Sequence, residues 1–150
     1  MAESKLRAEN LKSLVPEDKV DLRTYSPLTL AYLGDAVYEL AVRTELVKRA
    51  NCPVNRLNSM ASRMVKASAQ SGMASRIEPM LTEEETAVYR RGRNAHSPTM
   101  AKHATMSDYR RATGVEALVG YLYLCGRTER ILELMDAGLE GFSEGGGKNG

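Results

Sequence analysis

The sequence predicts an all-α domain. No stretch of the chain keeps the alternation of apolar and polar residues that marks a half-buried strand, whereas helix-starting and helix-ending residues recur. A chain of 150 residues is long enough for one domain with a hydrophobic core. We expect a loosely ordered segment over residues 1–22, one helical domain over residues 23–141, and a flexible Gly-rich tail over residues 142–150.

The first predicted helix opens at Ser26 and Pro27, an N-cap residue followed by a proline at the first helical position, and runs towards Arg49. Its apolar residues form two stripes. One stripe contains Leu33, Val37, Leu40, Thr44 and Val47, and the other contains Leu28, Ala31, Tyr38 and Val42 around Asp35. Apolar residues on both sides predict a helix that is covered on both faces, in the middle of the domain.

The segment Asn51-Cys52-Pro53 interrupts the chain after this helix. A second helix is predicted over residues 55–70, and a shorter helix or turn over residues 72–79 should stop before the proline. The sequence from Thr82 to Glu85 has the pattern of a capping box, which predicts a helix that runs from there towards Arg91.

The segment 92–107 is rich in Gly, Asn, Ser, Pro and Thr, which predicts a loop or a short irregular helix. Ser107 should then cap a long helix that runs through Cys125 and ends at Gly126. Thr128 should cap a final amphipathic helix.

Two carboxylates stand almost alone in apolar helical segments. Glu116 is the only charged residue between Ala112 and Gly126. In the apolar segment of residues 26–42, Asp35 and Glu39 are the only charged residues. Desolvating an unpaired carboxylate is costly, so each acid needs a positive partner. Two interpretations remain open from the residues alone: buried pairs with arginine, or a divalent cation such as Mg²⁺ held between the two oxygen donors.

The formal net charge of +2 implies little, but the charges are clustered. Residues 46–77 contain no acid, and Asp108 is the only acid among the bases from Arg90 to Arg111. Such clusters suit a phosphate backbone, although solvated helix faces would explain each cluster taken singly.

The segment RRGRNAHS, residues 90–97, is the best nucleic-acid candidate. Arg91 and Arg93 can chelate phosphates, Gly92 allows close backbone approach, and Asn94 and Ser97 can reach sugar hydroxyls. The candidate duplex-positioning residues also include Lys102, Arg56, Arg63 and Lys66. The aromatic content of 5% disfavours single-strand binding, which depends on stacking, and so favours a duplex.

His96 and His103 offer a rival chemistry, in which one histidine acts as base and the other as acid without metal. Their spacing within a loop gives no geometric support for this reading, and it stays a minor one.

Several other classes are disfavoured. Cys52 and Cys125 have no metal-ligand spacing and make no disulfide scaffold, and the first residues lack the apolar core of a signal peptide. No apolar run is long enough to span a bilayer. A reduced, cytoplasmic, soluble protein is expected.

The segment YLGDAV, residues 32–37, resembles the signature F-L-G-D-(S/A)-V of the ribonuclease III family, and VEALVG, residues 115–120, resembles its second acidic motif. The segments LAYLGDAVYE, LTEEE-x-x-V-x-RRGRNA-x-S and YR-x-(S/A)-T-G-x-EALVGYLYL are similar to those of the Mini-ribonuclease III branch. The resemblance covers roughly residues 26–141.

The resemblance implies a helical, homodimeric catalytic domain without a separate RNA-binding domain. It implies Mg²⁺-dependent endonucleolytic cleavage of double-stranded RNA that matures the ends of the 23S ribosomal RNA precursor. Asp35 and Glu116 carry over as the catalytic, metal-binding acids. Water activated by the metal would attack the phosphodiester and leave 5′-phosphate and 3′-hydroxyl ends.

The chain departs from the family at four positions where full-length ribonuclease III enzymes carry further acids: Leu28, Ala31, Asn58 and Thr113. Glu39 fits a solvated or salt-bridged role better than a ligand role. Two alternatives therefore remain, a non-catalytic double-stranded-RNA-binding module of the same fold and a helical interaction protein whose lone acids are salt bridges.

Overall fold

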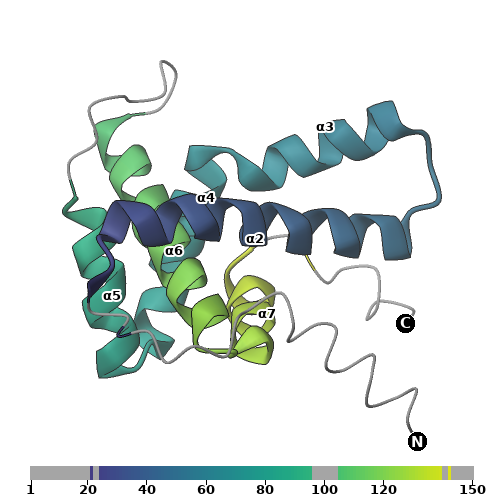
Figure 1. The fold of residues 1–150 in the computed structure, drawn as a ribbon. Helices are drawn as coiled ribbons and strands as arrows, with labels where there is room; N and C mark the ends of the chain where they lie inside the picture. The colour runs from purple at the N-terminus through teal and green to yellow at the C-terminus, as the bar shows by residue number, and fades with distance from the viewer. Residues whose placement is uncertain (1–20, 22–23, 96–104, 140–141, 143–150) are drawn as a thin grey trace, which may run out of the picture.

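The computed structural model describes residues 21, 24–95, 105–139 and 142, and every regular element in them is helical. The elements are α2 (Pro27–Arg49), α3 (Val54–Val65), α4 (Ala67–Ile77), the 3₁₀ helix η2 (Glu78–Met80), α5 (Glu83–Arg93), α6 (Met106–Leu124) and α7 (Thr128–Gly138) (Figure 1). The all-α prediction is confirmed. Apart from residues 21 and 142, the predicted terminal segments lie outside the described residues, and Phe142 is buried in the core.

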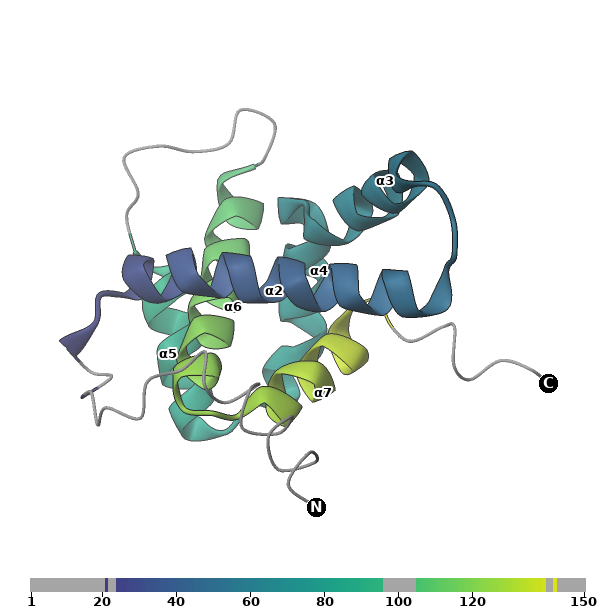
Figure 2. The ribbon, with the colours of Figure 1, turned by 45° about the vertical axis from the view of Figure 1, so that its right-hand side comes forward.

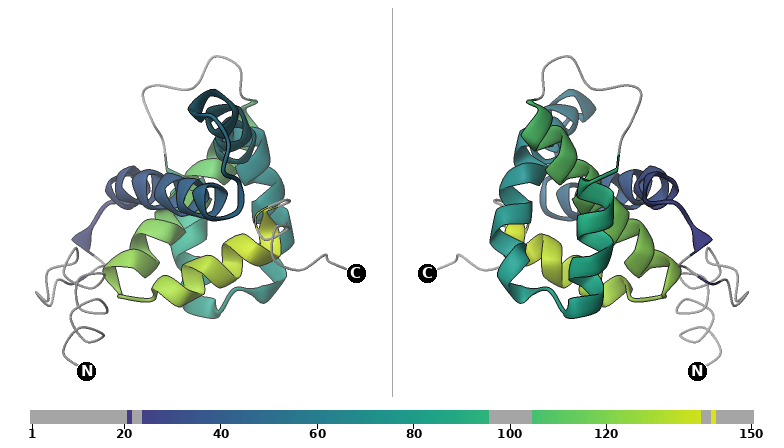
Figure 3. Two further views of the ribbon diagram at one scale, coloured as in Figure 1. Left: turned by 90° about the vertical axis from the view of Figure 1, so that its right-hand side faces the viewer. Right: turned by 90° about the vertical axis from the view of Figure 1, so that its left-hand side faces the viewer.

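Helix α6 is the centre of the fold. It contacts α2, α4, α5 and α7, and α2 crosses in front of it in Figure 2. Figure 3 shows the same crossing with α2 seen nearly along its axis. The residues from Ala112 to Val115 and from Ala117 to Gly120 are all buried, as expected for a helix that is apolar nearly all round.

Helix α2 is buried on one face only, which corrects the prediction that both of its faces are covered. Its buried residues are Leu30, Ala31, Gly34, Tyr38, Val42 and Leu46. Leu40 and Val47, from the other predicted stripe, are exposed. A stripe of apolar residues looks the same in sequence whether its own chain or another molecule covers it, so the pattern could not separate the two cases.

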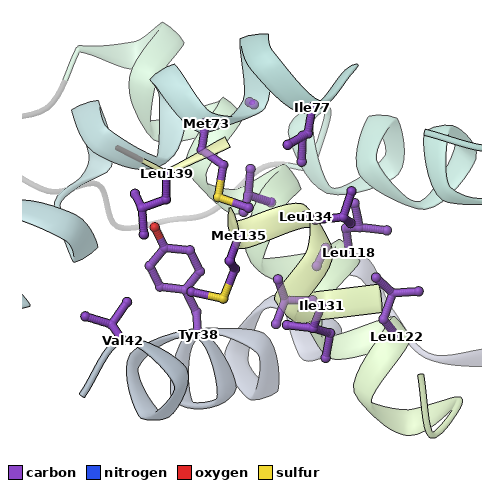
Figure 4. Packing of buried hydrophobic residues seen from close by; sticks show 14 of the residues in the cluster. Tyr38, Val42, Met73, Ile77, Leu118, Leu122, Ile131, Leu134, Met135 and Leu139 are labelled. Atoms are coloured by element: carbon purple, nitrogen blue, oxygen red, sulfur yellow. The ribbon is translucent and has the colours of Figure 1, made fainter. Parts of the chain in front are cut away.

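The core lies between α2, α4, α6 and α7. Figure 4 shows the Tyr38 ring pointing from α2 towards Met73 of α4 and Met135 of α7, with Leu139 beside them. The Tyr38 hydroxyl donates a hydrogen bond of 2.8 Å to the carbonyl oxygen of Met64, so its polar end is satisfied inside the core.

The carbonyl group in this hydrogen bond lies next to a break in the second predicted helix. The sequence predicted one helix over residues 55–70, but the chain becomes extended at Lys66, with ψ 153°, and α4 begins at the next residue. The carbonyl group that Tyr38 binds belongs to the last turn of α3, where carbonyls lack helical partners. Gly72, the first residue of the predicted shorter element, lies inside α4.

The helix starts follow two of the predicted caps and depart from two others. Thr128 does not cap α7, because the N-cap position is Arg127 and no side chain caps that end. The Ser26 side chain accepts from the Thr29 amide, and Thr82 forms the full capping box with Glu85. Thr105, and not Ser107, caps α6, because its hydroxyl accepts from the Asp108 amide at 3.0 Å. Both are good N-cap residues, and local sequence does not choose between them.

Candidate active site at the crossing of α2 and α6

Two glycines let the backbones of α2 and α6 touch. A Cβ atom added at Gly34 would lie 1.7 Å from the Glu116 carbonyl oxygen, and one added at Gly120 would lie 2.0 Å from the Leu30 carbonyl oxygen. No side chain fits at either position. The crossing therefore brings Asp35, which follows Gly34 in the chain, to Glu116 on α6.

The carboxyl groups of Asp35 and Glu116 are close enough to share a side-chain hydrogen bond. Asp35 is exposed, and Glu116 is partly buried. Burial raises the pKa of Glu116 to about 8, and the neighbouring Asp35 carboxylate contributes to this increase. Burial also raises the pKa of Tyr38, and the charge of Glu116 contributes to the increase.

No arginine or lysine among the described residues forms an ion pair with either acid. The described ion pairs lie elsewhere: Arg43 with Glu39, Arg127 with Glu84, and Arg130 with Glu85 and Glu133. The structure therefore disfavours the interpretation of the two acids as partners in buried salt bridges. Glu39 is itself paired with Arg43 at 2.9 Å, in keeping with a surface role.

The donor set of the pair fits a hard divalent cation. Two adjacent carboxylates without a basic partner repel each other, and a cation between them removes this cost. The exposure of Asp35 leaves room for water or phosphate oxygens, which Mg²⁺ keeps as ligands. In the described part of the chain no three His, Cys, Asp or Glu side chains form a group, so the pair would supply the carboxylate ligands alone.

Gln70 is a site residue that the sequence analysis did not identify. It lies on α4 with 2% of its surface exposed, and its amide group lowers the pKa of Glu116. The amide nitrogen is near Glu116 but has no partner within good hydrogen-bond geometry in the described residues. A lone amide among the small residues of the segment KASAQSGMA was the available signal.

The arginine-rich end of α5 is held against α6 close to the acid pair. A Cβ atom at Gly92 would lie 2.7 Å from Cβ of Ala117 and 3.1 Å from the Thr113 carbonyl oxygen, on either side of Glu116 in the chain. Arg91 reaches the Tyr25 carbonyl oxygen only weakly, at 3.5 Å. Arg93 lies over the Tyr89 ring, 5.8 Å from its centroid.

The structure describes only some of the other residues that the sequence predicted to bind RNA or act in cleavage. Asn94 caps the C-terminus of α5. Arg56 and Arg63 are exposed on α3, and Lys66 is exposed at the junction of α3 and α4. Four of the predicted residues fall outside the described residues: Ser97, Lys102, His96 and His103. Among the helices that the structure describes, none has the length and apolar character of a membrane span.

The chain is similar to known proteins in sequence and in fold. The sequence model of the ribonuclease III domain matches residues 28–127. Mini-ribonuclease 3 of Clostridium tetani is 48% identical over 118 residues, which are 78% of this chain and 78% of that protein. Mini-ribonuclease 3 of a Thermoanaerobacter species is 44% identical over 136 residues, which are 91% of this chain and 94% of that protein.

A solved structure from Fusobacterium nucleatum has the same fold, with a TM-score of 0.71 and 33% sequence identity. The match covers 77% of this chain and 93% of that structure.

Proposed function

Since this chain belongs to the ribonuclease III family and is an endoribonuclease, we propose that it cleaves double-stranded RNA with Mg²⁺ held by Asp35 and Glu116. The observation that carries the proposal is the contact between these two carboxylates, which have no basic partner in the described residues. We further propose that the substrate is the 23S ribosomal RNA precursor in the cytoplasm and that residues 23–141 form the catalytic domain.

The two acids have different tasks in the proposed reaction. Glu116 is partly buried and fixed beside the α2–α6 crossing, so it sets the position of the cation. Asp35 is exposed, so a phosphodiester from solution can reach it. Mg²⁺, when bound, supplies positive charge that polarises a phosphoryl oxygen and makes water a better nucleophile. The proposed products carry 5′-phosphate and 3′-hydroxyl ends.

The basic residues support recognition of a duplex through its phosphates. Arg91, Arg93 and Asn94 stand at the end of α5 that packs beside Glu116. Arg56, Arg63 and Lys66 are exposed and have no described ion pair. Such contacts position a phosphate backbone without reading its sequence. We add Ser97 and Lys102 to this set from the sequence alone.

The exposed stripe of α2 supports a homodimer. Tyr32, Leu40 and Val47 are 84%, 59% and 63% exposed, and they lie along one side of the helix. Large apolar side chains aligned on one exposed face mark an interaction surface. Pairing the stripes of two copies would cover these residues, and it would bring the second copy close to Asp35 on the same helix.

The test compares cleavage of a duplex RNA by the wild type with and without chelator, beside Asp35→Asn. Glu39→Gln is the matched control, since Glu39 is a carboxylate on the same helix that pairs with Arg43. We expect chelation and Asp35→Asn to abolish cleavage while RNA binding persists, and Glu39→Gln to cut normally. Cleavage that survives in chelator or in Asp35→Asn would refute the metal site and return attention to the histidines.

A further inference from the structure

A cleft between α5 and the 3₁₀ helix η2 is lined by neither acid of the candidate active site. Its volume of about 340 Å³ is at the small end of the range for small-molecule sites. Residues from one stripe of α5 line it together with residues at η2, among them Thr86, Tyr89, Arg90 and Arg93 from α5, and Glu78 and Leu81 from η2 and the residue after it.

Tyr89 lines the cleft and carries a buried hydroxyl group without a partner. The residue is 1% exposed, and its hydroxyl has no hydrogen-bond partner among the described residues. The ring is fixed by its neighbours: a Cβ atom at Gly114 of α6 would lie 2.8 Å from a ring carbon, and the Arg93 guanidinium lies over the ring, 5.8 Å from its centroid. Buried tyrosine hydroxyls usually have a partner, and a ligand in the cleft would supply one.

The Tyr89 hydroxyl keeps its proton at neutral pH. Burial raises the pKa of Tyr89 to about 12, and the charge of Glu78 contributes to the increase. The Glu78 carboxylate is near the hydroxyl but does not meet it in hydrogen-bond geometry. The hydroxyl is therefore a donor for an oxygen atom of a ligand.

The cleft carries more positive than negative charge. Arg90 and Arg93 are one turn apart on α5, and Glu78 is the acid that lines the cleft with them. Neither arginine forms an ion pair in the described part of the chain. Guanidinium groups without carboxylate partners suit the oxygen atoms of a phosphate group, which they bind through charge-assisted hydrogen bonds.

The remaining lining residues suit a nucleoside. The Glu78 carboxylate can accept from an N–H or O–H group, and Leu81 offers apolar surface to a ring. A bare phosphate ion would leave both side chains unused and would meet the negative charge of Glu78. A ligand with a phosphate at one end and a polar ring at the other uses both parts of the cleft.

We propose that this cleft binds a nucleoside monophosphate, either free or at the phosphorylated end of an RNA strand, with the phosphate on Arg90 and Arg93 and the nucleoside donating to Glu78. The Tyr89 hydroxyl donates to an oxygen atom of the same ligand. The proposal needs no cation at Asp35 and Glu116, so it stands apart from the proposed function.

The test is calorimetry on the whole protein in the presence of chelator, which prevents binding through a cation. AMP is the probe, and adenosine and inorganic phosphate are the partial ligands. We expect AMP to bind, and each partial ligand to bind at least about 10-fold more weakly, because each loses hydrogen bonds to charged groups.

Tyr89→Phe removes the hydroxyl and keeps the ring. It should weaken AMP binding by about 10-fold, the effect of one hydrogen bond to a charged group. Its melting temperature should equal that of the wild type or exceed it, because the hydroxyl has no partner in the described part of the protein. Tyr123→Phe is the control, since Tyr123 is a partly buried tyrosine of α6 that does not line the cleft, and it should bind AMP like the wild type.

Arg90→Gln is a second variant, and its matched control is Arg91→Gln. Both arginines are exposed on α5, but only Arg90 lines the cleft. Arg90→Gln should weaken AMP binding by at least about 10-fold, because a charge-assisted contact with the phosphate is lost. Arg91→Gln should bind AMP like the wild type.

A short single-stranded RNA with a 5′-phosphate, beside the same RNA with a 5′-hydroxyl, distinguishes the two sources of the ligand. Phosphate-dependent RNA binding that AMP displaces would assign the cleft to an RNA end, and binding of AMP alone would assign it to the free nucleotide.

The absence of both AMP binding and phosphate-dependent RNA binding would overturn the proposal. Adenosine or inorganic phosphate that binds as tightly as AMP would also overturn it, and so would equal losses of affinity in Arg90→Gln and Arg91→Gln. All of these measurements are made without Mg²⁺, so the proposed function is left intact by each of these outcomes.

Discussion

Gly34 of α2 and Glu116 of α6 are in backbone contact, with room for less than one methyl group between them: a Cβ atom at Gly34 would lie 1.7 Å from the Glu116 carbonyl oxygen. The separation between the two helices is therefore set by a hydrogen atom on Gly34. Because Asp35 is the next residue, the same contact fixes how closely the two acids approach.

The first prediction concerns this contact. Gly34→Ala should destabilise the protein by about 3 kcal/mol, because the methyl group meets backbone atoms that cannot move aside. Chemical denaturation measures the loss. Gly72→Ala is the control, since its Cβ would meet only the Arg76 side chain at 3.4 Å, and alanine is the better helix former by about 1 kcal/mol. Equal stability of Gly34→Ala and the wild type would contradict the close crossing.

The second prediction concerns the charge of the acid pair. In chelator, Asp35→Asn should be as stable as the wild type or more stable by roughly 1 kcal/mol, because Asp35 helps to raise the pKa of Glu116. Mg²⁺ should raise the melting temperature of the wild type, since a ligand stabilises the state that binds it, and should not affect the variant. Thermal melts with chelator and with Mg²⁺ make the comparison, and an equal Mg²⁺ effect on both proteins would argue against the site.

The third prediction concerns pH. The hydrogen bonds from Arg130 lower the pKa of Glu85, which is 2% exposed and lies 2.8 Å from the Arg130 guanidinium. A lowered pKa means that the folded state favours the ionised acid. The stabilisation is therefore fully present above the usual carboxyl pKa of 4.5 and is lost as the pH falls below it.

The measurement is denaturation of Glu85→Gln and the wild type at several pH values. At neutral pH the variant should lose roughly 2 kcal/mol, because a buried hydrogen bond to a charged group is weakened, and the difference should shrink in acid. Glu83→Gln, in the same turn of α5 but exposed, should follow the wild type. A difference that stays constant down to acid pH would show that the ion pair is not responsible.

The fourth prediction concerns assembly. Leu40→Lys should convert the proposed homodimer into a folded monomer, since Leu40 is exposed in the single chain and a charge would be buried in the paired stripes. Light scattering after size-exclusion chromatography gives the mass. The same substitution at Leu132, an exposed apolar residue of α7, should leave the dimer intact. A dimeric Leu40→Lys would place the interface elsewhere.

The fifth prediction concerns the basic surface of α3. Arg56→Gln combined with Arg63→Gln should weaken duplex binding and lower the slope of log affinity against log salt by about 1 for each lost phosphate contact. Arg127→Gln, whose charge pairs with Glu84, is the control and should keep the wild-type slope. An unchanged slope in the double variant would remove α3 from the RNA surface.

Much of the fold follows from short-range chemistry that the sequence displays. Ser26 with Pro27 and Thr82 with Glu85 start helices where the capping rules place them, because a cap depends only on residues within one turn. Asp35 and Glu116 were recognisable because they are isolated charges in apolar segments and lie in two ordered motifs.

Other features depend on contacts between distant segments. The break at Lys66 lies where Tyr38 binds the last turn of α3, and no local residue marks it. The position of Gln70 near Glu116 could not be predicted from the sequence, because it depends on the packing of α4 against α6. The exposure of one face of α2 could not be predicted either. The spacing of apolar residues indicates that a face is buried, but not whether its own chain or another molecule buries it.

The residues alone predict an all-helical chain, the resemblance to the ribonuclease III family and the importance of Asp35 and Glu116. The contact between these two acids, without a basic partner in the described residues, depends on the packing of segments that are far apart in the chain. The physical reason is the glycine crossing: Gly34 and Gly120 remove the side chains that would hold α2 and α6 apart, and this contact exists only when the two helices are packed together.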